Sequence, residues 1–80
     1  MQDLFANLPP QPSRWIPRIG ETYFFVLGNG SVQRIQWQGT RFDLEAWTFG
    51  NCFRVRRDAI QARDLIQNVL LRFHQYSTFR

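Results

Sequence analysis

The stretch Thr22-Tyr-Phe-Phe-Val-Leu-Gly-Asn-Gly-Ser-Val-Gln-Arg-Ile-Gln-Trp37 predicts a β-hairpin, and the other expected elements are placed relative to it. Its first part, residues 22–27, is a run of β-branched and aromatic side chains next to glycine, which is typical of a strand. Gly28-Asn29-Gly30 supplies residues that accept a positive φ, as a tight turn requires. Residues 31–37 are expected to form the return strand, in which Ile35 and Trp37 share one face and Arg34 and Gln36 share the other.

A long amphipathic helix is predicted from Arg56 to about Phe73. Apolar residues recur at spacings of three and four and form one stripe, made of Ala59, Ala62, Ile66, Val69 and Phe73 and widened by Leu65 and Leu70. Asp58 lies in the first turn, where the helix dipole favours a negative charge. No proline or glycine interrupts the run, so the helix is long enough to cover a small sheet.

The segment between hairpin and helix, residues 40–49, has no single clear period. Its mixed apolar and charged positions are Arg41, Phe42, Asp43, Leu44, Glu45, Trp47 and Phe49. We expect a third strand or an irregular loop there, followed by a turn at Gly50-Asn51 and a short extended piece at residues 52–55. The predicted fold class is therefore α+β, with an antiparallel β-hairpin or three-stranded sheet packed against one long C-terminal α-helix.

The chain of 80 residues suits one domain. Residues 1–13 include Pro9, Pro10 and Pro12, which interrupt any helix and indicate a flexible arm. We expect the α+β domain over residues 14–76 and a short tail at residues 77–80.

A cytoplasmic location is predicted from what the sequence lacks. The single cysteine cannot form an intramolecular disulfide, whereas small secreted domains usually carry several. No apolar run approaches the ~20 residues of a membrane span, so we expect no membrane association. The first residues lack a basic start and a long apolar stretch, so we expect no signal peptide.

The net charge is +4, and all basic residues are arginine. A GC-rich genome is one explanation for the missing lysine. Whatever the reason for the missing lysine, the planar guanidinium of arginine suits carboxylate, phosphate and stacking contacts. A basic domain of this size favours an acidic partner, which is either nucleic acid or an acidic protein face.

The densest basic cluster is the candidate binding site. It lies near the N-terminus of the predicted helix, whose dipole adds positive charge, and consists of Arg54, Arg56 and Arg57. Other arginines extend it, namely Arg14, Arg18, Arg34 and Arg41. Trp15 and Trp47 are candidate anchors, because tryptophan and arginine dominate interface hot spots. The alternatives are a solvated surface for the arginines and packing of Trp15 over the sheet.

No group of residues has the pattern of a catalytic or metal site, and we expect a non-enzymatic protein without cofactor, metal or small-molecule substrate. The only histidine, His74, has no partner at ligand spacing. Cys52 follows a turn and is expected to be a small buried apolar residue. Asp43 and Glu45 are expected to form a surface pair or to bridge to Arg41.

Two motifs are similar to those of a known group of proteins. The first motif leads into the hairpin and is Trp15-Ile-Pro-Arg-Ile-Gly-Glu-Thr-Tyr-Phe-Phe-Val26. The second motif precedes the helix and is Gly50-Asn-Cys-Phe53. They resemble W-x-P-x-x-G-E-x-Y-x-x-I and G-N-x-F-x-T-x-E-E-A of small, mostly uncharacterised phage and prophage proteins. The chain departs from that pattern at Val55, where the group has a capping threonine, and at Arg57-Asp58, where it has two acids.

The resemblance implies a phage origin and an accessory role. Our leading hypothesis is an inhibitor that docks on a bacterial defence complex, as anti-CRISPR proteins do. Its partner would be a protein or ribonucleoprotein in the cytoplasm of a bacterial host. The alternative is an accessory protein that binds nucleic acid directly, with arginines on phosphates and exposed aromatic rings on bases. A cryptic enzyme is a third, weaker hypothesis.

Overall fold

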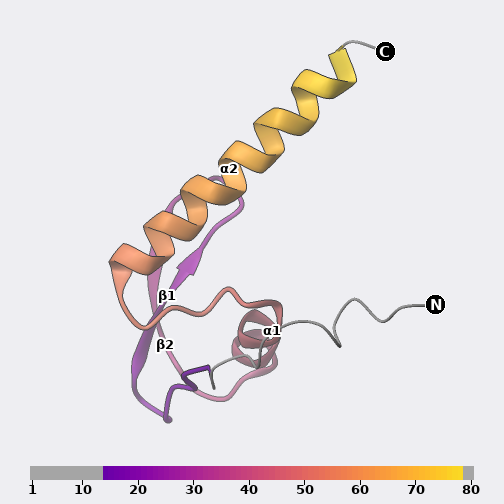
Figure 1. Cartoon of the computed structure of the whole chain (residues 1–80). Coiled ribbons are helices and arrows are strands. Elements are labelled where there is room, and N and C mark those ends of the chain that lie inside the picture. Colours follow the sequence, from indigo (N-terminus) through magenta and orange to yellow (C-terminus); the bar gives the residue numbers. More distant parts are fainter. Residues whose placement is uncertain (1–13, 79–80) are drawn as a thin grey trace, which may run out of the picture.

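The computed structural model describes residues 14–78, which form a β-hairpin and two helices. The elements follow the order β1 (Thr22–Val26), β2 (Val32–Gln36), α1 (Arg41–Phe49) and α2 (Arg56–Thr78). Figure 1 shows the short α1 beside one end of the hairpin and the long α2 running past the other. The predicted α+β class, with a hairpin packed against a C-terminal helix, is confirmed. The expected arm at residues 1–13 lies outside the described residues.

The two strands are antiparallel and pair with Tyr23 opposite Ile35. In the loop between them, the Gly30 N–H donates to the Leu27 carbonyl at 2.9 Å, and the Leu27 N–H donates to the Ser31 carbonyl at 2.8 Å. Gly30 has φ +88° and is the one loop glycine with positive φ. This pattern is typical of a three-residue hairpin loop that ends in a left-handed glycine.

The other edge of β1 is covered by the chain that leads into α2. Phe24 and Phe53 exchange two backbone hydrogen bonds of 2.8 and 3.0 Å. The side-chain amide of Asn51 continues this pairing, since its Oδ1 accepts from the Val26 N–H and its Nδ2 donates to the Val26 carbonyl, each at 2.8 Å. Within the expected extended piece at residues 52–55, Phe53 thus forms a bridge that protects the edge of β1, and the chain bends at residues 54 and 55.

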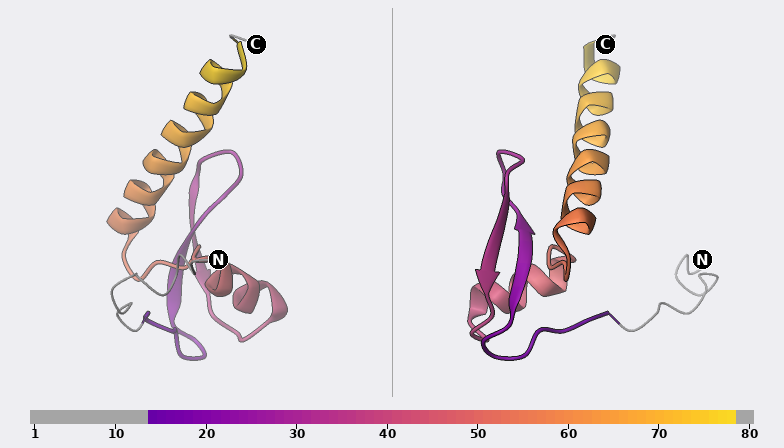
Figure 2. Two further views of the ribbon diagram at one scale, coloured as in Figure 1. Left: turned by 45° about the vertical axis from the view of Figure 1, so that its right-hand side comes forward. Right: turned by 90° about the vertical axis from the view of Figure 1, so that its left-hand side faces the viewer.

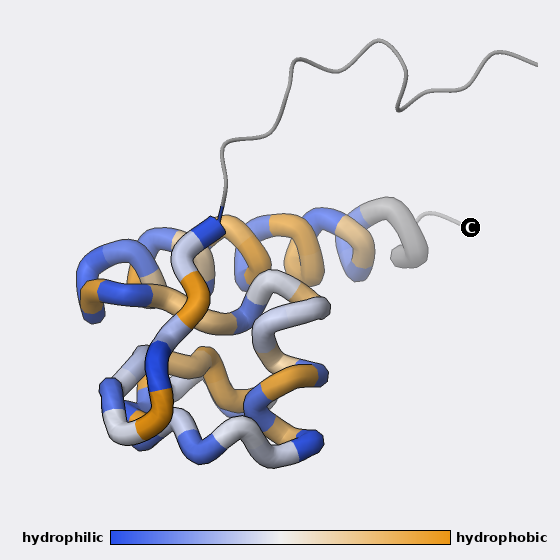
Figure 3. The backbone as a smooth tube through the Cα atoms, turned by 90° about the horizontal axis from the view of Figure 1, so that it is seen from below, coloured by the Kyte–Doolittle hydropathy of each residue, from blue (hydrophilic) through white to orange (hydrophobic). Residues whose placement is uncertain are grey.

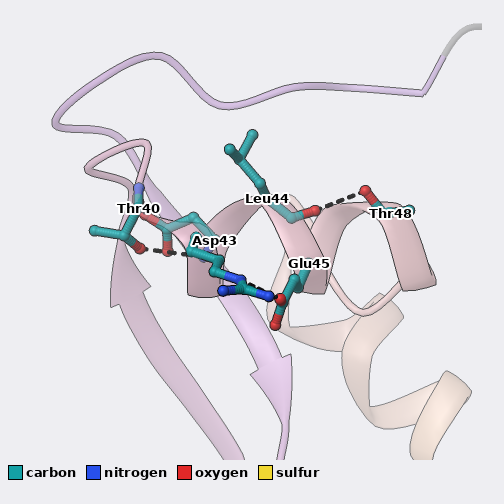
Figure 4. Close-up of polar contacts among 6 residues, drawn as sticks. Thr40, Asp43, Leu44, Glu45 and Thr48 are labelled. Atoms are coloured by element: carbon teal, nitrogen blue, oxygen red, sulfur yellow. Dashed lines mark hydrogen bonds and ion pairs between the residues drawn. The ribbon is translucent and has the colours of Figure 1, made fainter.

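Residues 41–49 form α1, so the expectation of a third strand or a loop at residues 40–49 was wrong. The Thr40 hydroxyl accepts from the Asp43 N–H at 3.2 Å, and the Asp43 carboxylate accepts from the Thr40 N–H (Figure 4). This reciprocal pair is a capping box, which satisfies free N–H groups at a helix start. Gly50, with φ +98°, ends the helix in the left-handed conformation.

The hairpin lies between the two helices (Figure 2). One of its faces carries Tyr23 and Phe25 toward α1, where the rings of Phe25 and Phe42 lie 5.1 Å apart. The opposite face carries Val26, which borders a hollow with residues of α2. Few apolar side chains are buried among the described residues: Pro17, Tyr23, Trp37, Ala46 and Ala59. The core is therefore small and depends on contacts from both helices.

The long helix begins at Arg56 as predicted and runs past the expected end at Phe73 to Thr78. Ala59 is fully buried, whereas the exposed apolar residues later in the helix include Ile66, Val69, Leu70, Leu71 and Phe73. Apolar positions recur along the turns of α2 in Figure 3. The predicted stripe is therefore a core contact only over its first turns. Within residues 14–78, no helix has the length and apolar character needed to cross a membrane.

Candidate functional site

Two tryptophans and two arginines meet where the segment before β1 passes α1. The indole N–H of Trp47 donates to the Trp15 carbonyl at 3.0 Å. Arg14 donates through Nη1 to the Trp47 carbonyl at 2.6 Å, and its guanidinium lies 3.9 Å from the Trp47 ring centroid. The Arg54 guanidinium lies 5.7 Å from the Trp15 ring. Three separate segments thus form one arginine–tryptophan cluster, held by cation–π contacts and hydrogen bonds.

This cluster borders a shallow hollow of about 290 Å³. Its lining consists of Arg14, Trp15, Trp47, Gly50, Cys52, Phe53, Arg54 and Asp58. Both indoles are half-buried, while the two arginines and Asp58 are exposed. The hollow therefore offers flat aromatic surface with guanidinium groups and one carboxylate at its border.

Cys52 is one of the ionisable residues that line the hollow. Burial is the main cause that raises the pKa of the Cys52 thiol to about 11. The negative charge of Asp43 also raises this pKa, whereas the positive charge of Arg14 lowers it. The thiol is therefore neutral near pH 7 and a poor nucleophile. His74, on the exposed part of α2, has its ring 6.0 Å from that of Phe73. Among the described residues, no group of His, Cys, Asp or Glu could hold a metal ion.

The other predicted binding residues are exposed but do not line the hollow. Arg56 and Arg57 lie in the first turn of α2, Arg18 precedes β1, and Arg34 lies on β2. Arg41 forms the expected exposed ion pair with Glu45, with 2.9 Å between Nε and Oε1. From the predicted set, the structure thus brings together Arg14, Trp15, Trp47 and Arg54.

Asp43 was expected at the surface, and the structure corrects this. Its carboxylate is buried and accepts hydrogen bonds from the Tyr23 hydroxyl and the Gln38 N–H. Burial alone would raise the pKa of Asp43, but these hydrogen bonds and those from Thr40 outweigh it and lower the pKa. Asp58, which was predicted only as a favourable charge in the first turn of the helix, lines the hollow of the candidate site.

No protein-family model, curated protein or solved structure matches this chain. The similarity to phage proteins stays a prediction.

Proposed function

We propose that this chain is a small non-enzymatic binding protein that docks on an acidic protein face through its arginine–tryptophan cluster. The observation that carries the proposal is the pairing of Arg14 with Trp47 and of Arg54 with Trp15 around one hollow. Both guanidinium groups are on exposed residues at the border of a flat apolar surface, where they can donate to a partner. This combination of a central aromatic anchor and flanking arginines is typical of interface hot spots.

Two features support a protein partner over nucleic acid. Asp58 lines the same hollow as the arginines and would repel phosphate groups, whereas on a protein partner it could pair with a basic residue. The Arg14 guanidinium already lies over the Trp47 ring, and the ring is half-buried. That ring is consequently a poor platform for stacking a base.

The wider proposal is that the partner is a bacterial defence complex of the CRISPR type, inhibited by occupation of its surface in the host cytoplasm. It is supported by the two phage-like motifs around Trp15 and Gly50 and by the small size of the chain. Defence complexes that hold nucleic acid present both protein faces and phosphates. Direct nucleic-acid binding remains the second candidate, favoured by the net charge of +4 carried by arginine alone.

A matched pair of charge reversals tests the proposal. Arg54→Glu alters the hollow, whereas Arg34→Glu makes the same change of charge on β2, outside it. Each full-length protein is immobilised and exposed to a bacterial lysate with and without nuclease. We expect a protein to be retained by wild type and Arg34→Glu after nuclease treatment, and Arg54→Glu to bind it about thirtyfold more weakly.

Direct nucleic-acid binding predicts a different result from the same proteins. Affinity for short single-stranded and duplex oligonucleotides would fall steeply with salt and would weaken similarly in both variants, because it follows total charge. A retained protein that both variants bind as tightly as wild type would contradict docking through the cluster.

A further inference from the structure

The outer edge of β1 is covered, whereas the outer edge of β2 is open. Phe24 directs its backbone N–H and carbonyl away from β2, because both bond to Phe53. Both backbone groups of Val26 also point away from β2, toward a side-chain amide. In an antiparallel pair, directly opposite residues point their backbone groups either toward each other or both outward. Arg34 lies opposite Phe24 and therefore points its backbone groups outward from β2, as does Val32 opposite Val26.

This edge of β2 carries three residues whose backbone is available to another chain. By the same alternation they are Val32, Arg34 and Gln36. Within residues 14–78, no hydrogen bond engages their outward N–H or carbonyl groups. Gln33, Arg34 and Gln36 are exposed, and the two helices lie on opposite faces of the hairpin (Figure 2). An uncovered row of donors and acceptors with this spacing is recognised by an extended backbone, which adds to the sheet as a further strand.

The charge on this edge indicates which extended chain it suits. Arg34 is the only charged residue of β2 and lies at its centre. It is exposed, and neither of the two ion pairs within residues 14–78 involves it. A carboxylate directly opposite on a neighbouring strand forms a stabilising cross-strand pair, whereas a like charge there is destabilising. The edge is therefore complementary to a strand that carries an acidic residue opposite Arg34.

The same arginine disfavours pairing with β2 of a second copy. Two-fold pairing centred on Arg34 places the two guanidinium groups directly opposite each other. The next register in either direction leaves them on diagonal positions, which are still within reach of long side chains. Larger shifts pair this short strand over only part of its length. A charged residue on an edge strand is a usual protection against such self-pairing, so the edge suits a different chain.

We propose that the open edge of β2 binds an extended acidic segment of another protein as an added antiparallel strand. An acidic residue of that segment lies opposite Arg34. The residue before the acid then lies opposite Ile35, and the second residue after it lies opposite Val32. Both of these β2 residues are apolar and half-buried, so apolar side chains at the two facing positions add favourable cross-strand contacts.

This site is separate from the proposed docking surface. The described residues that line the hollow beside the arginine–tryptophan cluster include none of β2. Arg34→Glu should therefore lose the acidic segment but still retain the partner of the cluster. Failure of one proposal is for this reason distinguishable from failure of the other.

Fluorescence anisotropy of a labelled peptide with the full chain tests the proposal. The peptide is Ser-Thr-Val-Glu-Thr-Val-Ser with both ends blocked, and its control has lysine in place of glutamate. We expect wild type to bind the glutamate peptide about tenfold more tightly than the lysine peptide, and Arg34→Glu to reverse this preference. Arg72→Glu makes the same change of charge at an exposed position of α2 and should bind as wild type does.

Backbone methylation separates strand addition from simple attraction of charge. In the proposed register the glutamate N–H of the peptide faces β2, whereas the N–H of the following threonine faces away. N-methylation at glutamate should weaken binding about tenfold, and N-methylation at threonine should leave it nearly unchanged. Val32→Pro removes an outward N–H at the first residue of β2, where strands accept proline, and should weaken binding with unchanged circular dichroism.

Three results overturn the proposal. They are no binding by wild type at about 1 mM peptide, equal binding of the glutamate and lysine peptides, and equal effects of the two N-methylations. A wild-type chain that forms dimers in sedimentation velocity, and loses them in Val32→Pro, also overturns it and assigns the edge to a second copy.

Discussion

The Tyr23 hydroxyl on β1 donates a hydrogen bond of 2.6 Å to the Asp43 carboxylate on α1, with Tyr23 fully buried and Asp43 2% exposed. The second oxygen of Asp43 accepts from the Gln38 N–H at 2.8 Å and from the Thr40 N–H at 3.3 Å. One carboxylate thus caps α1, fixes the chain that leaves β2 and joins both to β1. This arrangement determines where α1, and with it Trp47, lies on the hairpin.

Asp43→Asn should destabilise the domain strongly. The amide oxygen can still accept from Tyr23, but the amide nitrogen then faces the N–H groups of Gln38 and Thr40 as a donor against donors. Loss of charged, buried hydrogen bonds of this kind costs about 2–3 kcal/mol in the free energy of unfolding, measurable by urea denaturation. The control is Asp64→Asn, an exposed position, for which we expect a change within about 0.5 kcal/mol. Equal losses in both variants would contradict the assigned role.

The same carboxylate predicts a loss of stability in acid. Its pKa is lowered in the folded chain, below the value of about 3.9 for an unfolded aspartate, so the unfolded state binds protons more readily as pH falls. The stabilisation from Asp43 is complete well above pH 4 and is lost as pH drops through the folded pKa. We expect urea midpoints of wild type to fall over this range and those of Asp43→Asn to fall less. Parallel curves for the two proteins would argue against this linkage.

The helix α1 was not predicted from the sequence, because the buried residue that stabilises it is the charged Asp43. Phe42 and Ala46 have helical spacing, and Thr40-x-x-Asp43 before Gly50 has the pattern of a capped helix. The buried residue between them is an aspartate, however, so apolar periodicity gives no clear helical face. The mixture of apolar and charged residues then left a third strand or an irregular loop as the two expectations. The hairpin and the start of α2 were predictable because their patterns are local and apolar.

Any side chain added at Gly30 should lower the free energy of unfolding. Its φ of +88° is left-handed, and an L-residue there costs about 1–2 kcal/mol. Gly30→Ala should therefore lower the free energy of unfolding by that amount, read from the urea midpoint. Gly28→Ala is the matched control, because Gly28 does not have positive φ and no atom lies within 4 Å of an added Cβ. If Gly28→Ala costs as much as Gly30→Ala, the loop conformation is not the one described.

The candidate site was predictable only in its composition. The density of arginine near the start of α2 drew attention to Arg54, and Trp15 and Trp47 were selected as candidate anchors. Their meeting depends on contacts between residues 32 or more positions apart, such as the hydrogen bond from Trp47 to Trp15. No local pattern encodes that contact, because it follows from the placement of α1 by Asp43. The exposure of Ile66 was missed for a related reason, since periodicity reveals an apolar face but not the length of the hairpin that covers it.

The Asn51 side chain offers the last test, because it pairs with the β1 edge as a backbone group would. Asn51→Asp keeps the acceptor for the Val26 N–H but places a negative oxygen against the Val26 carbonyl in place of the amide donor. We expect a loss of about 1–3 kcal/mol in urea denaturation and faster hydrogen exchange of the Val26 amide. Asn29→Asp is the control: within the part of the chain that the structure describes, Asn29 bonds through its side-chain oxygen, which accepts from the Ser31 N–H and hydroxyl, so aspartate can replace it with little loss. If Asn29→Asp is as destabilising as Asn51→Asp, the added charge is responsible and the proposed edge pairing is not supported.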